Sequence, residues 1–99
     1  MSEPTIEHKP KKQRYEAIVD GETAGYISYE RIADALDLQH TVVEPAFEGR
    51  GIGSALARGV FEDLRANGEL TAIPTCPFLA RWLGKHEEYA DLRHRPSTD

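Results

Sequence analysis

The stretch HTVVEPAFEGRGIGSAL, which starts at His40, constrains the fold of this 99-residue chain most, because a strand pattern changes there to a helix pattern. β-Branched residues at 41–43 favour a strand. Pro45 ends it, because proline has no N–H to give to a ladder. Glycines follow at three alternate positions, Gly49, Gly51 and Gly53. From there apolar residues recur every four positions, as on the buried face of a helix.

The flanking segments complete a single α+β domain. Period-two alternation, turn residues and helix caps predict strands over residues 14–20, 24–32, 37–44 and 70–74 and helices over residues 53–66 and 77–84. The first three strands are expected to be antiparallel, in a mainly antiparallel sheet with helices packed on it. A right-handed βαβ crossover then lays the last strand parallel to the third. Gly59 inside the helix indicates that a neighbouring strand comes close.

The chain ends are expected to lie outside this domain. Residues 1–12 are polar with two prolines and predict a flexible arm, and residues 94–99 predict a flexible tail. The folded domain is therefore expected over residues 13–93. Without a long apolar run or a signal-peptide pattern, the protein is expected to be cytoplasmic, away from membranes and monomeric.

Composition argues against several classes of partner. The net charge is −5 and the Lys and Arg residues are dispersed, so the basic footprint of a nucleic-acid binder is missing. Cys76 is the lone cysteine and the four histidines are far apart, which argues against a disulfide and against a metal site.

A glycine turn that enters a helix is a candidate anion site. The first N–H groups of a helix lack partners and the helix dipole adds positive charge there. Arg50 could add a charge and Ser54 a hydroxyl. The alternative is a sharp turn and a helix start with no ligand. The Walker pattern lacks its lysine and the dinucleotide pattern has Leu56 in place of its third glycine, so ATP and NAD are disfavoured.

The run EGRGIGSAL after HTVVEPAF, together with the downstream TCPF and HEEYADL, resembles the GNAT (Gcn5-related N-acetyltransferase) superfamily and its small single-domain YjdJ-type branch. The resemblance covers most of the chain from about Arg14. It implies a GNAT-like sheet whose last two strands splay, and acetyl-CoA or CoA as co-substrate. It also implies N-acetyl transfer to an amine, which is either a small molecule or a peptide. Glu48 departs from the family pattern, which has glutamine or arginine there, and is expected to point to solvent while Arg50 compensates.

The resemblance also implies a set of cofactor-binding residues, in which pantetheine lies along the third strand and phosphates lie on the glycine loop. The expected residues are Val42, Val43, Glu48, Gly49, Arg50, Gly51, Ile52, Gly53, Ser54, Cys76, Pro77 and Phe78. Phe78 and Trp82 could stack on the ligand, but their helical spacing favours a place in the core.

Two residues are candidates for the chemistry. His40 could be the general base or an inert histidine packed beside the core. Cys76 could carry the acetyl group, protonate the leaving thiolate or only pack beside the thioester. Burial is expected to raise the pKa of Cys76, which favours direct attack by the amine. The alternatives are a CoA-binding protein with little catalysis, acting as a sensor or interaction module, and an interaction domain without a ligand.

Overall fold

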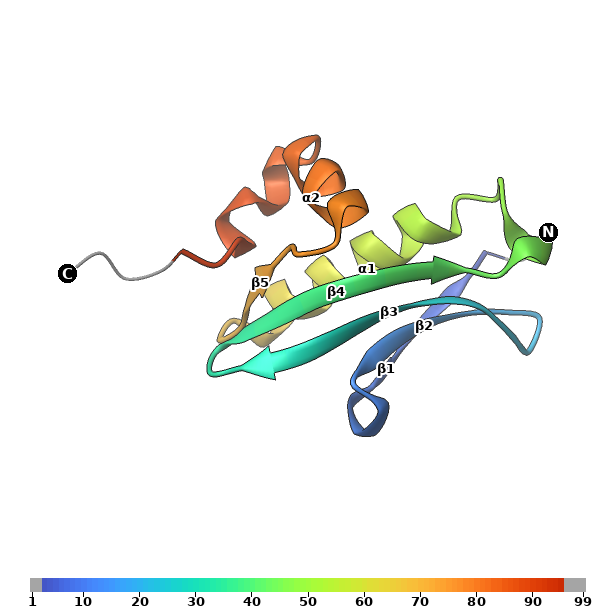
Figure 1. Ribbon diagram of the computed structural model, residues 1–99, viewed down its shortest axis with the longest axis horizontal. Coiled ribbons are helices and arrows are strands. Elements are labelled where there is room, and N and C mark those ends of the chain that lie inside the picture. The colour runs from blue at the N-terminus through green and yellow to red at the C-terminus, as the bar shows by residue number, and fades with distance from the viewer. Residues whose placement is uncertain (1–2, 96–99) are drawn as a thin grey trace.

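Five strands form one curled sheet whose spatial order follows the order of the chain. The computed structural model describes residues 3–95 (Figure 1). The strands are β1 (Thr5–Lys9), β2 (Arg14–Val19), β3 (Glu22–Ile32), β4 (Ala35–Val43) and β5 (Thr71–Ile73). The helices are α1 (Ile52–Asn67) and α2 (Pro77–Gly84), with 3-10 turns η1 (Pro10–Lys12), η2 (Pro45–Phe47) and η3 (Glu87–Leu92).

The α+β prediction is confirmed. Strands β1 to β4 are antiparallel neighbours, and β5 pairs in parallel with β4 after the crossover through α1. Helix α1 packs against β2, β3 and β4, and α2 packs against β4. No helix of the described residues is long and apolar enough to cross a membrane.

The prediction of a flexible arm over residues 1–12 is wrong for residues 5–12, which form β1 and η1. Strand β1 pairs with β2 along its whole length. The His8 ring stacks on Tyr15 with centroids 4.2 Å apart, and His8 Nε2 lies 2.6 Å from the Tyr29 hydroxyl. A Cβ on Gly59 would lie 2.7 Å from Ile6, so the close strand that Gly59 predicted is β1.

At the other end of the chain, His94 is held in place. Its N–H donates to the Ala72 carbonyl at 2.7 Å, and its Nδ1 lies 3.1 Å from the Thr71 hydroxyl. The tail predicted over residues 94–99 therefore does not begin at His94. Residues 1–2 and 96–99 lie outside the described residues.

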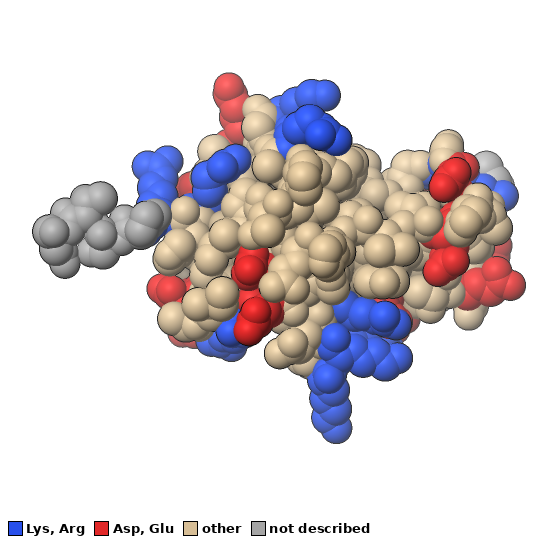
Figure 2. Space-filling model, in the orientation of Figure 1, with Lys and Arg blue, Asp and Glu red and all other residues tan. Residues whose placement is uncertain are grey.

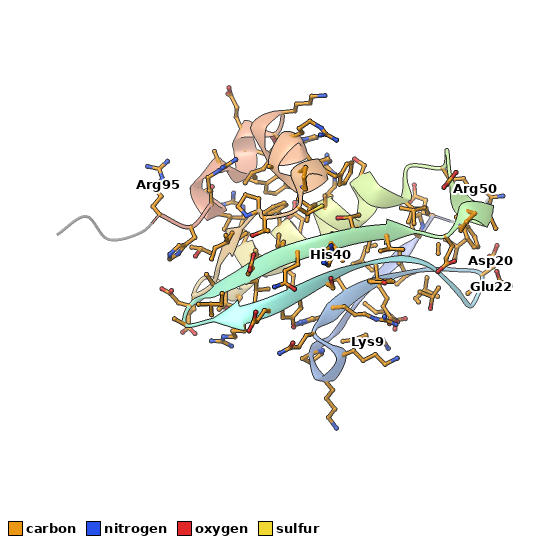
Figure 3. The ribbon with its side chains drawn as sticks, in the orientation of Figure 1. Lys9, Asp20, Glu22, His40, Arg50 and Arg95 are labelled. Carbon is orange, nitrogen blue, oxygen red and sulfur yellow. The ribbon has the colours of Figure 1, made fainter. Side chains whose placement is uncertain are left out.

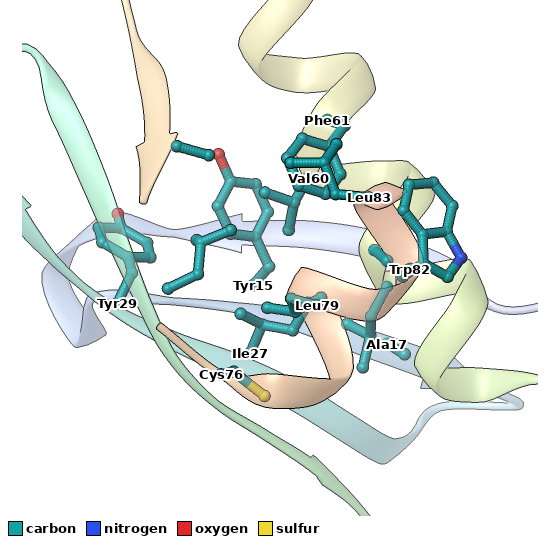
Figure 4. Packing of buried hydrophobic residues seen from close by; sticks show 14 of the residues in the cluster. Tyr15, Ala17, Ile27, Tyr29, Val60, Phe61, Cys76, Leu79, Trp82 and Leu83 are labelled. Carbon is teal, nitrogen blue, oxygen red and sulfur yellow. The ribbon is translucent and has the colours of Figure 1, made fainter. Parts of the chain in front are cut away.

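The core lies between the sheet and the two helices (Figure 4). The fully buried face of α1 carries Leu56, Val60, Phe61 and Leu64, as the four-residue spacing predicted. Leu79, Trp82 and Leu83 of α2 close the core beside them. Burial of this apolar surface fixes both helices on one side of β4.

Strands β4 and β5 separate after a short paired stretch, as predicted. Their pairing covers only Ala35–Asp37 of β4. Strand β4 then continues to Val43, while the chain after β5 turns into α2. A bulge lies at the same level, because His40 pairs with Ser28 and Leu38 with Tyr29, which leaves Gln39 as an extra residue.

Candidate functional site

Two adjoining cavities lie where β4 separates from β5. One has a volume of about 360 Å³ and is lined by the glycine loop, the start of α1 and the aromatic residues of α2. The other, of about 310 Å³, reaches Thr41 on β4. Both cavities are lined by Val43, Glu48, Gly53 and Phe78. They therefore form one continuous surface from the edge of β4 to the first turn of α1.

The first turn of α1 is open toward the larger cavity. Gly49 and Gly51 have φ values of +80° and +74°, a conformation that side chains rarely adopt, and a Cβ on either would meet nothing within 4 Å. Gly51 is the N-cap residue, and no side chain caps the helix. The N–H groups that begin α1 thus have no side-chain acceptor, as in an anion site.

Gly53 lies in the first turn of α1, where the helix was predicted to begin, and a Cβ there would approach Cζ of Phe78 to 3.1 Å. Gly53 therefore lets the Phe78 ring pack on the first turn of the helix, and this ring forms a wall shared by both cavities.

A hydrogen bond joins α2 to the same turn. The indole N–H of Trp82 donates to Oγ of Ser54 at 2.9 Å, and both residues line the larger cavity. Trp82 is 5% exposed, so the prediction that it belongs to the core is confirmed. Its polar edge nevertheless reaches the candidate site.

Glu48 is exposed, and it also lines both cavities. The Arg50 guanidinium lies 5.3 Å from the centre of the Phe47 ring and lines neither cavity. Among the described residues, no lysine or arginine lines either cavity. Figure 2 shows acidic side chains at the end of the molecule where Figure 3 places Arg50, Asp20 and Glu22. Anion binding here would therefore depend on backbone N–H groups and hydroxyls.

Only one of the two valines predicted to offer backbone groups lies on the free edge of β4. The Val42 carbonyl faces β3, because its oxygen would lie 2.5 Å from a Cβ placed on Gly25 of that strand. The Glu44 N–H also faces β3 and donates to the Ala24 carbonyl. Backbone groups alternate in direction along an antiparallel strand, so those of Thr41 and Val43 face the gap. Val42 is therefore not placed to bind a ligand through its backbone.

Cys76 lies at the narrow end of the gap. Its N–H donates to the Leu38 carbonyl at 2.9 Å, and its thiol donates to Oγ1 of Thr41 at 3.5 Å. The side chain is buried, and neither cavity is lined by it or by Pro77.

The pKa of the Cys76 thiol is lowered, which corrects the expectation from burial. Burial is the largest single influence and raises the pKa. Once the thiol has lost its proton, the sulfur accepts hydrogen bonds from the Thr41 hydroxyl and from the backbone N–H groups of Leu79, Phe78 and Thr41, and these together outweigh the effect of burial. Pro77 removes one amide donor, but the next two N–H groups of α2 are directed at the sulfur.

His40 lies on the other face of the sheet. Thr41 pairs with the buried Ile27 and so faces the helices, whereas His40 pairs with Ser28 and is exposed. Figure 3 shows His40 midway along β4, far from the glycine loop that carries Arg50. The histidine is thus not packed in the core, and β4 separates it from the two cavities.

The structure brings together most of the predicted cofactor-binding residues. Those that line the cavities are Val43, Glu48, Gly49, Gly51, Ile52, Gly53, Ser54 and Phe78. Thr41 and Phe47 also line them and were not predicted to do so, and Trp82, for which a place in the core was preferred, lines the larger cavity as well. The four-residue spacing of Phe78 and Trp82 could have indicated that both reach one surface, because residues i and i+4 share a helix face.

Comparisons with known proteins agree with this architecture. A family model described as GCN5-related N-acetyl-transferase matches residues 14–92. Protein NATD1 of Xenopus tropicalis is 31% identical over 80 residues, which cover 79% of this chain and 72% of that protein. Protein NATD1 of Gallus gallus is 29% identical over 91 residues, covering 90% of this chain and 82% of that protein.

Solved structures share the fold. The solution structure of a GCN5-like protein from Staphylococcus aureus superposes with a TM-score of 0.69 at 24% identity, covering 98% of this chain and 94% of that one. A crystal structure of a GNAT-family protein from Desulfovibrio desulfuricans has a TM-score of 0.54 at 27% identity, covering 74% of this chain and 52% of that one.

Proposed function

We propose that this chain, which belongs to the GCN5-related N-acetyltransferase family, binds acetyl-CoA in the two adjoining cavities and transfers its acetyl group to an amine. One observation carries the proposal. The uncapped first turn of α1, entered through two glycines with positive φ, opens into a cavity that continues to the free edge of β4. A long ligand fits this arrangement if it has an anionic middle part, which would lie at the first turn of α1, and an arm that forms hydrogen bonds, which would lie along the edge of β4.

The parts of acetyl-CoA have matching surfaces in this site. The pyrophosphate would take the N–H groups that begin α1 and the hydroxyl of Ser54. The pantetheine arm carries amides, and the backbone groups of Val43 at the edge of β4 are available to pair with them. Phe78 would form the apolar wall along this arm.

The proposed reaction is direct attack on the thioester. The amine nitrogen forms a bond to the thioester carbon, the carbon–sulfur bond breaks, the amine loses a proton and the CoA thiolate gains one. Holding both reactants at one gap supplies much of the rate. The position of Cys76 supports this route, because its buried sulfur lines neither cavity and would have to move to accept the acetyl group.

His40 and Cys76 are proposed for the two proton transfers. His40 is exposed on the sheet face opposite the cavities, so it would accept the proton of an amine that reaches the thioester from that face, through the gap between β4 and β5. The Cys76 thiol lies near the gap with a lowered pKa, which makes it a better proton donor to the leaving thiolate.

The test uses acetyl-CoA with a panel of small amines and lysine-containing peptides, and measures the release of free CoA. Intact mass after incubation with acetyl-CoA alone identifies the route. Direct transfer predicts no stable acetyl adduct. An adduct that is absent in Cys76→Ala and is discharged by amine would instead establish transfer through the cysteine.

A CoA-binding protein with little catalysis is the second candidate. It is favoured by Glu48, an acidic residue that lines both cavities, and by the lack of lysine and arginine among the described residues that line them. Binding of CoA without release of CoA from acetyl-CoA by any amine would support it.

A further inference from the structure

We propose that Trp82 is a positioning residue for the ligand pyrophosphate, because it turns the Ser54 hydroxyl toward the larger cavity. This inference rests on the proposed function. Ser54 lies in the first turn of α1 and lines that cavity, and the indole N–H of Trp82 donates to its Oγ at 2.9 Å.

The direction of the indole N–H is fixed by packing. The Trp82 ring lies between Phe61, whose ring centroid is 5.6 Å away at an interplanar angle of 5°, and His86, at 3.7 Å and 11°. Tyr89 stacks at 5.6 Å as well. In Figure 4 the indole nitrogen lies on the side of the Trp82 ring that points away from Phe61. Trp82 therefore has little freedom to direct its N–H anywhere except at Ser54.

The chemistry of the two groups fixes which one donates. An indole nitrogen is only a donor, so Ser54 must be the acceptor, and the serine proton is turned away from Trp82. That proton can go to a carbonyl of the preceding turn or to a ligand oxygen in the cavity. A ligand oxyanion bound to the N–H groups of α1 would attract the serine proton. The hydrogen bond that Ser54 accepts from Trp82 also makes its hydroxyl a stronger donor.

The composition of the cavity makes this donor important. Since no lysine or arginine among the described residues lines it, and Glu48 does, a neutral hydroxyl aimed at the phosphates is one of few favourable contacts. The same indole connects the phosphate end of the site to α2, the helix that also carries Phe78.

The experiment is a double-mutant cycle with Trp82→Phe and Ser54→Ala, with binding measured by calorimetry. Trp82→Phe keeps an aromatic ring and removes the N–H. We expect Ser54→Ala to weaken CoA about tenfold and Trp82→Phe to weaken it about fivefold, as for a hydrogen bond to a charged group. In the Ser54→Ala background the further loss from Trp82→Phe should be smaller than about twofold. Ser54→Thr keeps the hydroxyl, so in this background Trp82→Phe should again weaken CoA binding by most of the factor seen in the wild type.

Three probes separate positioning from packing. Dephospho-CoA keeps the pyrophosphate and should show the same losses as CoA. Pantetheine has no phosphate, and its binding, followed by chemical-shift titration, should be unaffected by either variant. Melting curves establish that each variant is folded at the temperature of measurement.

Several results would overturn the inference. One is an equal loss from Trp82→Phe with and without the serine hydroxyl, and another is an equal loss of pantetheine binding, because both indicate packing alone. A loss confined to CoA and missing with dephospho-CoA would assign the effect to the 3′-phosphate. If the wild type bound neither CoA nor dephospho-CoA, the proposed function would fail together with this inference.

Discussion

The Cys76 N–H donates a hydrogen bond to the Leu38 carbonyl at 2.9 Å, at the level where β4 and β5 separate. This bond sets the start of α2 against β4 and places the Cys76 sulfur beside Thr41. The cavity edge on β4 and the cavity wall on α2 are therefore joined directly, without an intervening loop.

Replacement of Gly51 by valine should abolish stabilisation of the fold by CoA. The residue has φ +74°, which a β-branched side chain tolerates poorly, and it caps the turn that would receive phosphate. In the wild type, CoA at about 100 times its dissociation constant should add about 2.7 kcal/mol to the free energy of unfolding. The melting temperature with and without CoA measures the difference.

Gly68→Val is the matched control. Gly68 has φ +75° and equally open surroundings, but it ends α1 instead of beginning it. This variant should lose stability and keep the increase in melting temperature with CoA. If millimolar CoA left the melting temperature of the wild type unchanged, the phosphate site would be disproved.

Glu48→Gln should bind CoA more tightly than the wild type. The change removes the negative charge of a residue that lines both cavities, and relief of repulsion from a nearby phosphate at the surface is worth about 0.5–1 kcal/mol, or roughly two- to fivefold in affinity. Glu44→Gln, an exposed neighbour that lines neither cavity, should have little effect. Weaker binding by Glu48→Gln would indicate that the carboxylate accepts a hydrogen bond from the ligand.

His40→Gln should lower the turnover rate at neutral pH by at least about tenfold while the affinity for CoA stays constant. General base catalysis contributes about 100-fold or more, and the residue lies across β4 from the cavities. His94→Gln is the control, since His94 contacts Thr71 at the far end of the sheet. An unchanged turnover rate in His40→Gln would assign the proton transfer to another group.

Thr41→Val should raise the pKa of the Cys76 thiol. The valine removes the hydroxyl hydrogen bond that helps to lower this pKa against the effect of burial. The ultraviolet absorbance of the thiolate, with Cys76→Ala as the blank, measures the titration. Thr75→Val, next to the cysteine and bonded to Asp37 instead, should leave the titration unchanged.

The sign of the linked stability follows from the direction of this shift. A thiol whose pKa is lowered on folding stabilises the fold at pH values above its unfolded pKa. That contribution is lost as the pH falls through the lower folded value. The wild type should therefore gain stability over Thr41→Val as the pH rises through the alkaline range. An equal pH dependence of the two unfolding curves would contradict the assigned hydrogen bonds.

Gly59→Ala should destabilise the protein by about 1–3 kcal/mol, although alanine favours helices. Its Cβ would lie 2.7 Å from Ile6, so β1 or α1 must move. Ile6→Ala in the Gly59→Ala background should recover part of the loss, since it removes the atoms that clash. Urea unfolding of the two single variants and the double variant measures the coupling, and strictly additive losses would show that β1 does not press on α1.

The long elements were predictable because their patterns are local. The β-branched run of β4, the four-residue spacing of α1 and the proline that begins α2 each specify an element from neighbouring residues alone. Strand β1 was missed because five residues with mixed polarity between two prolines carry little strand signal. It is stabilised by contacts with distant residues, such as that of His8 with Tyr29.

The site was predicted less completely because some of its geometry is not local. The extra residue Gln39 changes which backbone groups of β4 face the gap, so of the two predicted valines Val43 faces it and Val42 does not, while Thr41 faces it without having been predicted. Glycines at 49 and 53 look alike in sequence, yet one adopts a positive φ and the other makes room for a ring from α2. The pKa of Cys76 depends on Thr41, a residue 35 positions away.

The spatial order of the strands has a consequence for folding. Because β1 to β4 lie side by side in the order in which they are synthesised, each new strand can pair with the one before it as the chain emerges from the ribosome. Only β5 needs a crossover, and it must wait for α1. The gap between β4 and β5 is therefore expected to be completed last, so a chain interrupted before β5 would carry an antiparallel sheet with no place for a ligand.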